Sequence, residues 1–290
     1  MAKAIRSLGL DPYVINVQDE YVLKSTLYAY LRYPIPVLMF EGITDISDPT
    51  NHRHLDWHAI AITGFSLGIP NPVPSNNFLL RASRIDKIYA HDDQLGPFSR
   101  MVFDGNQVTI DGKAENSLST SWRLSGTLGK VRAVPKHFLI PLYHKIRIPF
   151  PDIHDAVLLF DRLIAAPLKQ ANIPAVKDPL EWDIYLTSVN DLKASVFKAQ
   201  LLILNSRKIL LLEELPRFIW VATAMCQGKP ALTLLFDATD VQQGRFFLCA
   251  VEYDSTFAQV LRAFSKPMAT QLANVQPHVW RIFAWFANSP

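Results

Sequence analysis

A histidine and two aspartates occupy positions that suit a proton-transferring pair. His58 opens an apolar strand in the segment LDWHAIAITGFS, and Asp92 and Asp93 close the next apolar strand, KIYAHDDQLGPF, about 35 residues later. A neutral imidazole at a strand end can take a proton from a thiol, and a carboxylate on its other ring nitrogen fixes the tautomer and orientation of the ring. Because adjacent strands bring such residues within reach, the pattern indicates a general base with an orienting acid.

The elements before the histidine strand must position it. Residues 2–8 predict the end of a helix, with Gly9 as its C-terminal cap. Asp19 opens a second predicted helix, in which leucines recur every four residues. The apolar run 36–40 (PVLMF) predicts a short buried strand, and we expect a polar loop from there to His54.

The histidine strand should present two different faces. His58, Ile60 and Ile62 are expected on one side, because side chains alternate along a strand, and Gly64 permits a bend at its end.

The region beyond this strand reads as rich in β-structure. We expect a pair of strands around 78–80 and 84–90, and a hairpin of 100–103 with 107–110 across the Asp104-Gly105 turn. The polar stretch 111–125 is expected to be a long loop or the edge of a module.

These motifs resemble those of papain-like cysteine peptidases. A histidine is followed by an alternating apolar strand and Gly-Phe, and a second apolar strand ends in an acidic turn with Gly-Pro. The pattern is most similar to the bacteriocin-processing (double-glycine) peptidase group and its uncharacterised bacterial relatives, and the strand PVLMF has its counterpart there. The resemblance covers about residues 1–110. It implies that His58 is the general base and Asp92 the orienting acid, with Asp93 as the alternative acid.

The nucleophile of that family has no counterpart in this sequence. The family places a cysteine at the start of a long helix near the N-terminus, after a glutamine that supplies an oxyanion donor. The first residues here, MAKAIRSLGLDPYVI, resemble the last turns of that helix and the strand after it. Cys226 and Cys249 match no family position, and their apolar surroundings indicate buried thiols.

A metal site is a competing interpretation of the histidines. His52, His54, Asp56 and His58 all carry side chains that can bind zinc. Alternate residues on one strand cannot all converge, and no second cluster has ligand spacing, so we expect solvated loop histidines and no metal or other cofactor.

The second half of the chain predicts another α/β module without a recognisable family. A helix is expected over 153–171, a strand over 182–189, and a helix capped by Asn190. Further strands are expected around the Gln227-Gly228 turn and over 246–254. Ser255 is expected to cap a last helix.

Composition excludes several classes of protein. Apolar residues make up 49% and charged residues 19%, which is a globular balance, and the formal net charge of +3 gives no strong field for nucleic acid. No apolar run reaches the roughly 20 residues of a membrane span, and no signal peptide is evident, so we expect a cytoplasmic protein without a membrane span.

We therefore expect a mixed α/β (α+β) fold with antiparallel sheets, made of a papain-like part at 1–125 and an α/β module at 126–290. The expected function is that of a papain-like cysteine peptidase relative, a bacterial pseudoenzyme that cannot hydrolyse peptide bonds as this chain stands, because the thiol is missing. The alternative is a non-catalytic scaffold of the same fold that binds a peptide or protein partner. A third interpretation is an unrelated α/β protein, in which His58 and Asp92 would lie more than about 6 Å apart.

Overall fold

The computed structural model describes residues 1–17, 19–68, 74–75, 77–122, 130–171, 179–198, 210–241, 246–273 and 276–289. Its contacts divide the chain into two units. Unit 1 comprises Met1–Pro72 and Ala82–His144, and unit 2 comprises Val73–Arg81 and Lys145–Pro290. Both units combine helices with largely antiparallel sheets, so the expected mixed α/β class is confirmed.

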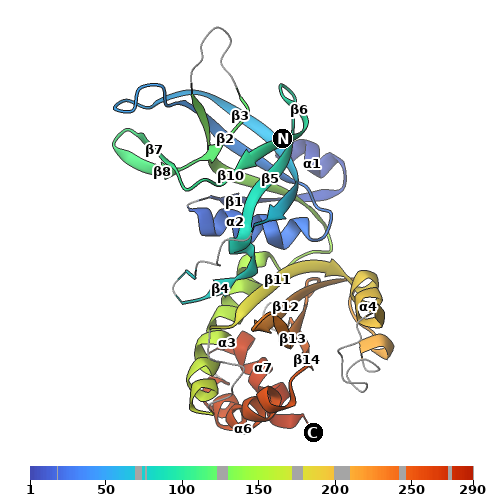
Figure 1. The fold of residues 1–290 in the computed structure, drawn as a ribbon. Coiled ribbons are helices and arrows are strands. Elements are labelled where there is room, and N and C mark those ends of the chain that lie inside the picture. Colours follow the sequence, from blue (N-terminus) through green and yellow to red (C-terminus); the bar gives the residue numbers. More distant parts are fainter. Residues whose placement is uncertain are drawn as a thin grey trace. The chain divides into compact units, whose positions relative to one another are not determined.

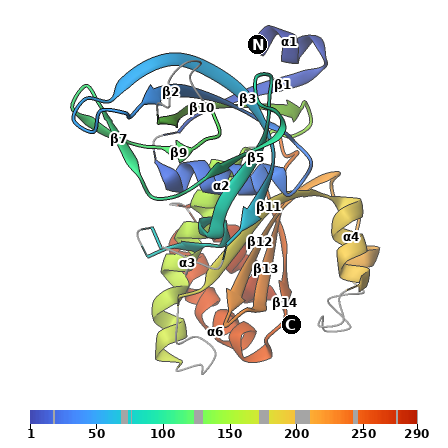
Figure 2. The same ribbon diagram turned by 45° about the horizontal axis from the view of Figure 1, so that its top comes forward.

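Unit 1 is built on a seven-stranded antiparallel sheet in the order β1-β10-β2-β3-β5-β6-β9. Because β9 pairs with β10 as well as with β6, the sheet closes on itself (Figure 2); Figure 1 gives the labels of most other strands. The strands are β1 (Leu10–Asn16), β2 (Val37–Asp45), β3 (Arg53–Leu67), β5 (Ile85–Asp92), β6 (Gly96–Val102), β9 (Leu118–Ser119) and β10 (Val131–Tyr143), and a separate hairpin consists of β7 (Gln107–Ile110) and β8 (Lys113–Asn116).

The long curved strand β3 follows the predicted alternation. Ile60 and Ile62 are buried, and His58 lies on the same side of the strand. The pairing of β3 with β5 shifts register between Ile62 and Gly64, so the glycine marks a bulge where a bend was expected.

Two helices accompany this sheet. The first is α1 (Ala2–Ser7), after which Gly9 adopts a φ of +73°. The second is α2 (Glu20–Leu31), which begins where Asp19 accepts a hydrogen bond from the backbone N–H of Val22. Both helices were predicted. Leu8, the last residue of the first predicted helix, lies just beyond α1, and its side chain is exposed.

Three local expectations for unit 1 were wrong. Strand β2 continues to Asp45, and β3 already begins at Arg53, so the expected loop before His54 is shortened to residues 46–52. Strand β7 pairs with β8 and not with β6, so no hairpin forms across Asp104-Gly105. The polar stretch after Asp111 contains β8 and β9, and its residues 123–125 lie outside the described residues.

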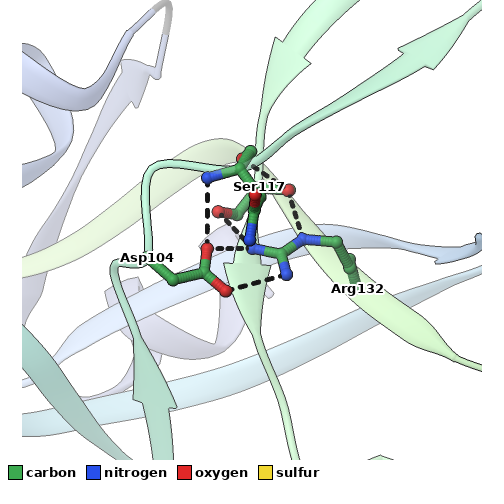
Figure 3. A network of polar contacts seen from close by, with 4 residues as sticks. Asp104, Ser117 and Arg132 are labelled. Carbon is green, nitrogen blue, oxygen red and sulfur yellow. Dashed lines mark hydrogen bonds and ion pairs between the residues drawn. The ribbon is translucent and has the colours of Figure 1, made fainter.

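The turn at Asp104 does not join a hairpin; its carboxylate binds a buried arginine. Arg132 of β10 is 7% exposed, and its guanidinium binds both carboxylate oxygens of Asp104. Its Nε donates to the Ser117 hydroxyl at 2.6 Å, and Figure 3 shows the three side chains converging. Ser117 directly precedes β9, so this network fixes the strand that closes the sheet.

Unit 2 contains a five-stranded sheet in the order β14-β13-β12-β11-β4. Only the short β4 pairs in parallel. Figure 1 shows α3, α6 and α7 on one face of this sheet and α4 on the other. The strands are β4 (Leu79–Leu80), β11 (Glu181–Ser188), β12 (Phe218–Cys226), β13 (Lys229–Asp237) and β14 (Phe247–Glu252), and the helices are α3 (Phe150–Gln170), α4 (Val189–Lys198), α6 (Ser255–Leu272) and α7 (Pro277–Asn288); a 3-10 turn, η1 (Arg81–Arg84), follows β4.

Each face of this sheet has its own core. On the side of α3, Trp220 packs against Phe150 and donates its indole N–H to the carbonyl of Ile148 at 2.8 Å. The face covered by α4 buries another apolar cluster that includes Ile219, Val221 and Leu235. The alternation along β12 therefore supplies apolar side chains to both faces, as a central strand requires.

Most predicted elements of unit 2 are confirmed, with corrections at their ends. The β12–β13 turn has positive φ at Gln227 and Gly228, as a tight hairpin needs. Asp254 caps α6 in place of Ser255, and Asn190 lies inside α4. Residues 199–204 of the helix expected after Asn190 fall outside the described residues.

The strand expected around 78–80 does not pair with the one that follows it. It is β4, and it belongs to unit 2 through its pairing with β11. At the other end of unit 1, β10 lies within the sheet, so the contacts place the division at His144 and not at residue 125. No described helix is both long and apolar enough to cross a membrane.

Candidate functional site

The predicted base and acid meet at one end of the unit 1 sheet. His58 lies on β3, and Asp92 is the last residue of the neighbouring strand β5. The distance from His58 Nε2 to Asp92 Oδ2 is 3.2 Å, and the two side chains are 10% and 3% exposed. The structure therefore brings together the two residues that the sequence singled out.

Asp92 is held firmly by groups around it. Its Oδ1 accepts hydrogen bonds from the backbone N–H groups of Gln94 (2.8 Å) and Leu95 (3.1 Å), and its Oδ2 accepts one from Trp122 Nε1 (2.9 Å). Burial raises the pKa of Asp92, but these hydrogen bonds and the charge of His58 outweigh that effect and hold the pKa below its usual value. Asp92 is thus an ionised, oriented acceptor.

Trp122 also covers the histidine. The rings of His58 and Trp122 lie edge to face, with their centroids 4.8 Å apart. The His58 Nε2–H does not point straight at Asp92, so the contact is close without being an aligned hydrogen bond. Such bonds are often poorly aligned in a protein without substrate. A proton held on Nε2 by Asp92 leaves the lone pair on Nδ1, which is the atom that can accept a proton.

Asp93 occupies the edge of this cluster. Its Oδ1 lies 3.7 Å from His58 Nε2, and its side chain is 82% exposed. The ligand atoms of His58, Asp92 and Asp93 all fall within 4.8 Å of one another. Among the described residues, these three side chains form the group that is able to hold a metal ion.

Glu41 is a buried acid that the sequence analysis missed. It lies on β2 directly opposite His58, so both side chains project from the same face of the sheet. Glu41 is 1% exposed, and neither carboxyl oxygen has a hydrogen-bond partner in the described structure. Burial, with a smaller effect of the Asp92 charge, raises the pKa of Glu41 to about 8. Glu41 is therefore mostly protonated at neutral pH.

The other histidines of the loop do not join this cluster. His52 Nδ1 accepts a hydrogen bond from the backbone N–H of Thr109 at 2.9 Å. The His54 ring packs on Trp57 with centroids 4.5 Å apart and lies so close to Gly42 that an added Cβ would approach it to 3.1 Å. These contacts give His52 and His54 structural roles.

The two cysteines lie in unit 2, and neither is an activated thiol. Cys226 is buried at the end of β12. Cys249 lies in the cluster beneath α4, where burial and the nearby Glu213 raise its pKa to about 11. A thiol with a raised pKa stays protonated at neutral pH and is a poor nucleophile.

A separate cavity of about 530 Å³ lies in unit 1 between the start of α2, the β7–β8 hairpin and β10. Its lining mixes apolar side chains such as Leu23 and Phe103 with charged ones such as Lys113 and Lys136. His58, Asp92 and Trp122 do not line it.

The sequence contained weak signals for the two missed residues. Glu41 is the acid that directly follows the apolar run PVLMF, where a strand continuing inward would bury it. Trp122 is the large aromatic residue within an otherwise polar stretch, which is unusual for a solvated loop.

Comparisons with protein-family models, with curated proteins and with solved structures found no match to this chain.

Proposed function

We propose that unit 1 carries the general-base half of a papain-like thiol peptidase. In this proposal, His58 takes the proton of a thiol through Nδ1, and Asp92 holds the ring from the Nε2 side. Trp122 shields the pair from water and donates to the same carboxylate oxygen. Peptide bonds are the substrate class that the resemblance implies.

The observation that supports the proposal most is the 3.2 Å approach of His58 Nε2 to Asp92 Oδ2. The separation is well below the roughly 6 Å at which the resemblance would count as accidental. The lowered pKa of Asp92 is also what the role requires, because an ionised carboxylate fixes the tautomer and stabilises the imidazolium that forms.

The chain does not supply the thiol at this site. Unit 1 contains no cysteine, and in unit 2 Cys226 is buried and Cys249 is partly buried with a raised pKa. A base and an acid alone cannot form the covalent intermediate of a thiol peptidase, so this chain by itself should not hydrolyse peptides. The proposal therefore requires a cysteine from outside these 290 residues.

A non-catalytic scaffold that binds a peptide or protein partner is the second candidate. The observation that favours it is the cavity beside α2, which offers both apolar and charged contacts without the residues of the base–acid pair.

The test begins with the protein from its native source. Its intact mass, compared with the in-frame coding sequence before Met1, shows whether a cysteine is present upstream. If so, alkylation of that cysteine should abolish peptide hydrolysis by the longer protein. His58→Ala should lower its kcat/KM by about 10²- to 10⁴-fold, the usual contribution of a general base.

The control is His91→Ala, which removes an exposed imidazole next to Asp92 and should leave hydrolysis unchanged. Hydrolysis that survives His58→Ala would overturn the proposal. A native product that begins at Met1 would also contradict it and favour the binding role.

A further inference from the structure

We propose that His58, Asp92 and Asp93, supported by Glu41, form a binding site for a first-row divalent cation such as Zn²⁺. This inference goes beyond the proposed function, since it requires no thiol and no substrate. It rests on the geometry of the ligand atoms, on their charge and on buried polar atoms that have no partner.

The ligand atoms already have the spacing of a metal site. His58 Nε2 lies 3.2 Å from Asp92 Oδ2 and 3.7 Å from Asp93 Oδ1. Zinc binds nitrogen and oxygen at about 2.0–2.2 Å, so two ligands of a tetrahedral ion lie roughly 3.3 Å apart. One cation can therefore contact all three side chains with small adjustments, mainly of the exposed Asp93.

The charge of the cluster favours a cation. Two carboxylates, Asp92 and Asp93, lie beside the His58 imidazole, and no lysine or arginine of the described structure forms an ion pair with Glu41, Asp92 or Asp93. Such a concentration of acidic groups at a largely buried point is unfavourable unless protons or a cation compensate it.

Unpartnered buried atoms point to the same place. Both carboxyl oxygens of Glu41 and Nε2 of His58 are buried without a hydrogen-bond partner in the described structure. Glu41 is the cross-strand neighbour of His58, on the same face of the sheet, and experiences the charge of Asp92. An unpartnered buried polar group requires an explanation, and a bound ion is one that fits two such groups beside two carboxylates.

The surroundings also suit a metal ligand. The Oδ1 of Asp92 is fixed by two backbone N–H groups, which leaves Oδ2 in a set orientation. Asp93 is exposed, so a cation can enter from solvent. One imidazole with carboxylates suits Zn²⁺ better than the all-oxygen ions Mg²⁺ and Ca²⁺.

Cation binding and base catalysis oppose each other at this site. A cation on Nε2 takes the place of the proton that Asp92 would hold there. The neutral ring then carries its proton on Nδ1, so Nδ1 can no longer accept one. Zinc should therefore inhibit any activity that depends on His58.

The test is calorimetric titration of ZnCl₂ into the full chain after treatment with a chelator, at pH 7. We expect one ion per chain. His58→Ala should abolish binding, and Asp93→Ala and Glu41→Gln should weaken it about 10- to 100-fold, the range for lost or misoriented supporting ligands. The control His91→Ala should bind as the wild type does, and MgCl₂ should give much weaker binding.

The Asp93→Ala variant keeps the test decisive even if His58→Ala does not fold, because Asp93 is exposed and begins the turn after β5. The absence of stoichiometric binding would overturn the inference. Binding that persists in both Asp93→Ala and Glu41→Gln would overturn it as well, since the ion would then lie elsewhere. Zinc binding does not require a thiol. A negative calorimetric result would therefore not argue against the proposed base–acid pair.

Discussion

Replacing Arg132 with alanine is expected to lower the free energy of unfolding of unit 1 by about 1.5–3 kcal/mol, because Ser117 and Asp104 lose charge-assisted hydrogen bonds while the partly exposed Asp104 carboxylate can still be hydrated. The guanidinium is buried and binds Asp104 and Ser117 at four points. Its loss leaves the Asp104 carboxylate and the Ser117 groups without their partner. The network also fixes β9, so the closure of the sheet should weaken with it.

Hydrogen exchange of the backbone amides of β9 and β10, followed by mass spectrometry, measures this effect within unit 1. The matched control is Lys87→Ala, which breaks a more exposed pair with Asp86 and should cost less than about 1 kcal/mol. If Arg132→Ala changed protection no more than Lys87→Ala, the network would not be what closes the sheet.

Replacing Glu41 with glutamine is expected to remove a strong pH dependence from the stability of unit 1. The pKa of Glu41 rises from 4.5 to about 8 on folding. At pH values between these two, the carboxyl group ionises in the unfolded protein but keeps its proton in the folded protein. The free energy of unfolding is therefore highest below about pH 4.5 and falls as the pH rises towards 8. The difference across this window is on the order of 4 kcal/mol.

Unfolding free energies from hydrogen exchange at pH 5 and pH 8, in buffer with a chelator, test this expectation. The unfolding free energy of Glu41→Gln should match that of the wild type near pH 5 and exceed it at pH 8. Glu20→Gln, which alters an exposed carboxylate on α2, should show the same pH dependence of the unfolding free energy as the wild type. Equal slopes for the wild type and Glu41→Gln would mean that Glu41 does not keep its proton in the folded state.

The sequence predicted the parts of the site that follow from local periodicity. The strand alternation placed His58 with Ile60 and Ile62, and the acidic turn placed Asp92 at the end of the next strand. The antiparallel pairing of β3 with β5 then brings His58, within β3, close to the end of β5 without further information. Local capping rules were equally sufficient for Asp19 and α2.

The remainder of the site depends on contacts between residues far apart in the chain. Trp122 reaches Asp92 from a stretch that appears from composition to be a solvated loop. Glu41 is buried because β2 continues beyond the apolar run and pairs with both β3 and β10. Such pairing is decided by the whole sheet, so propensity alone could not place either residue.

The same reason explains the misplaced hairpin and boundary. Asp104-Gly105 has the composition of a tight turn, but the Asp104 carboxylate is drawn to the buried Arg132 instead. Residues 131–143 fall in the predicted second module because they follow a long polar stretch. They in fact form the strand that pairs with β1, β2 and β9.

The most direct test of the base–acid pair is the position of the proton on the His58 ring. A long-range ¹H–¹⁵N correlation spectrum of chelator-treated protein, assigned with His58→Gln, distinguishes the two neutral tautomers. We predict a proton on Nε2 in the wild type and a mixture of tautomers in Asp92→Ala. A proton on Nδ1 in the wild type, or a tautomer that is unchanged in Asp92→Ala, would contradict the role assigned to the pair.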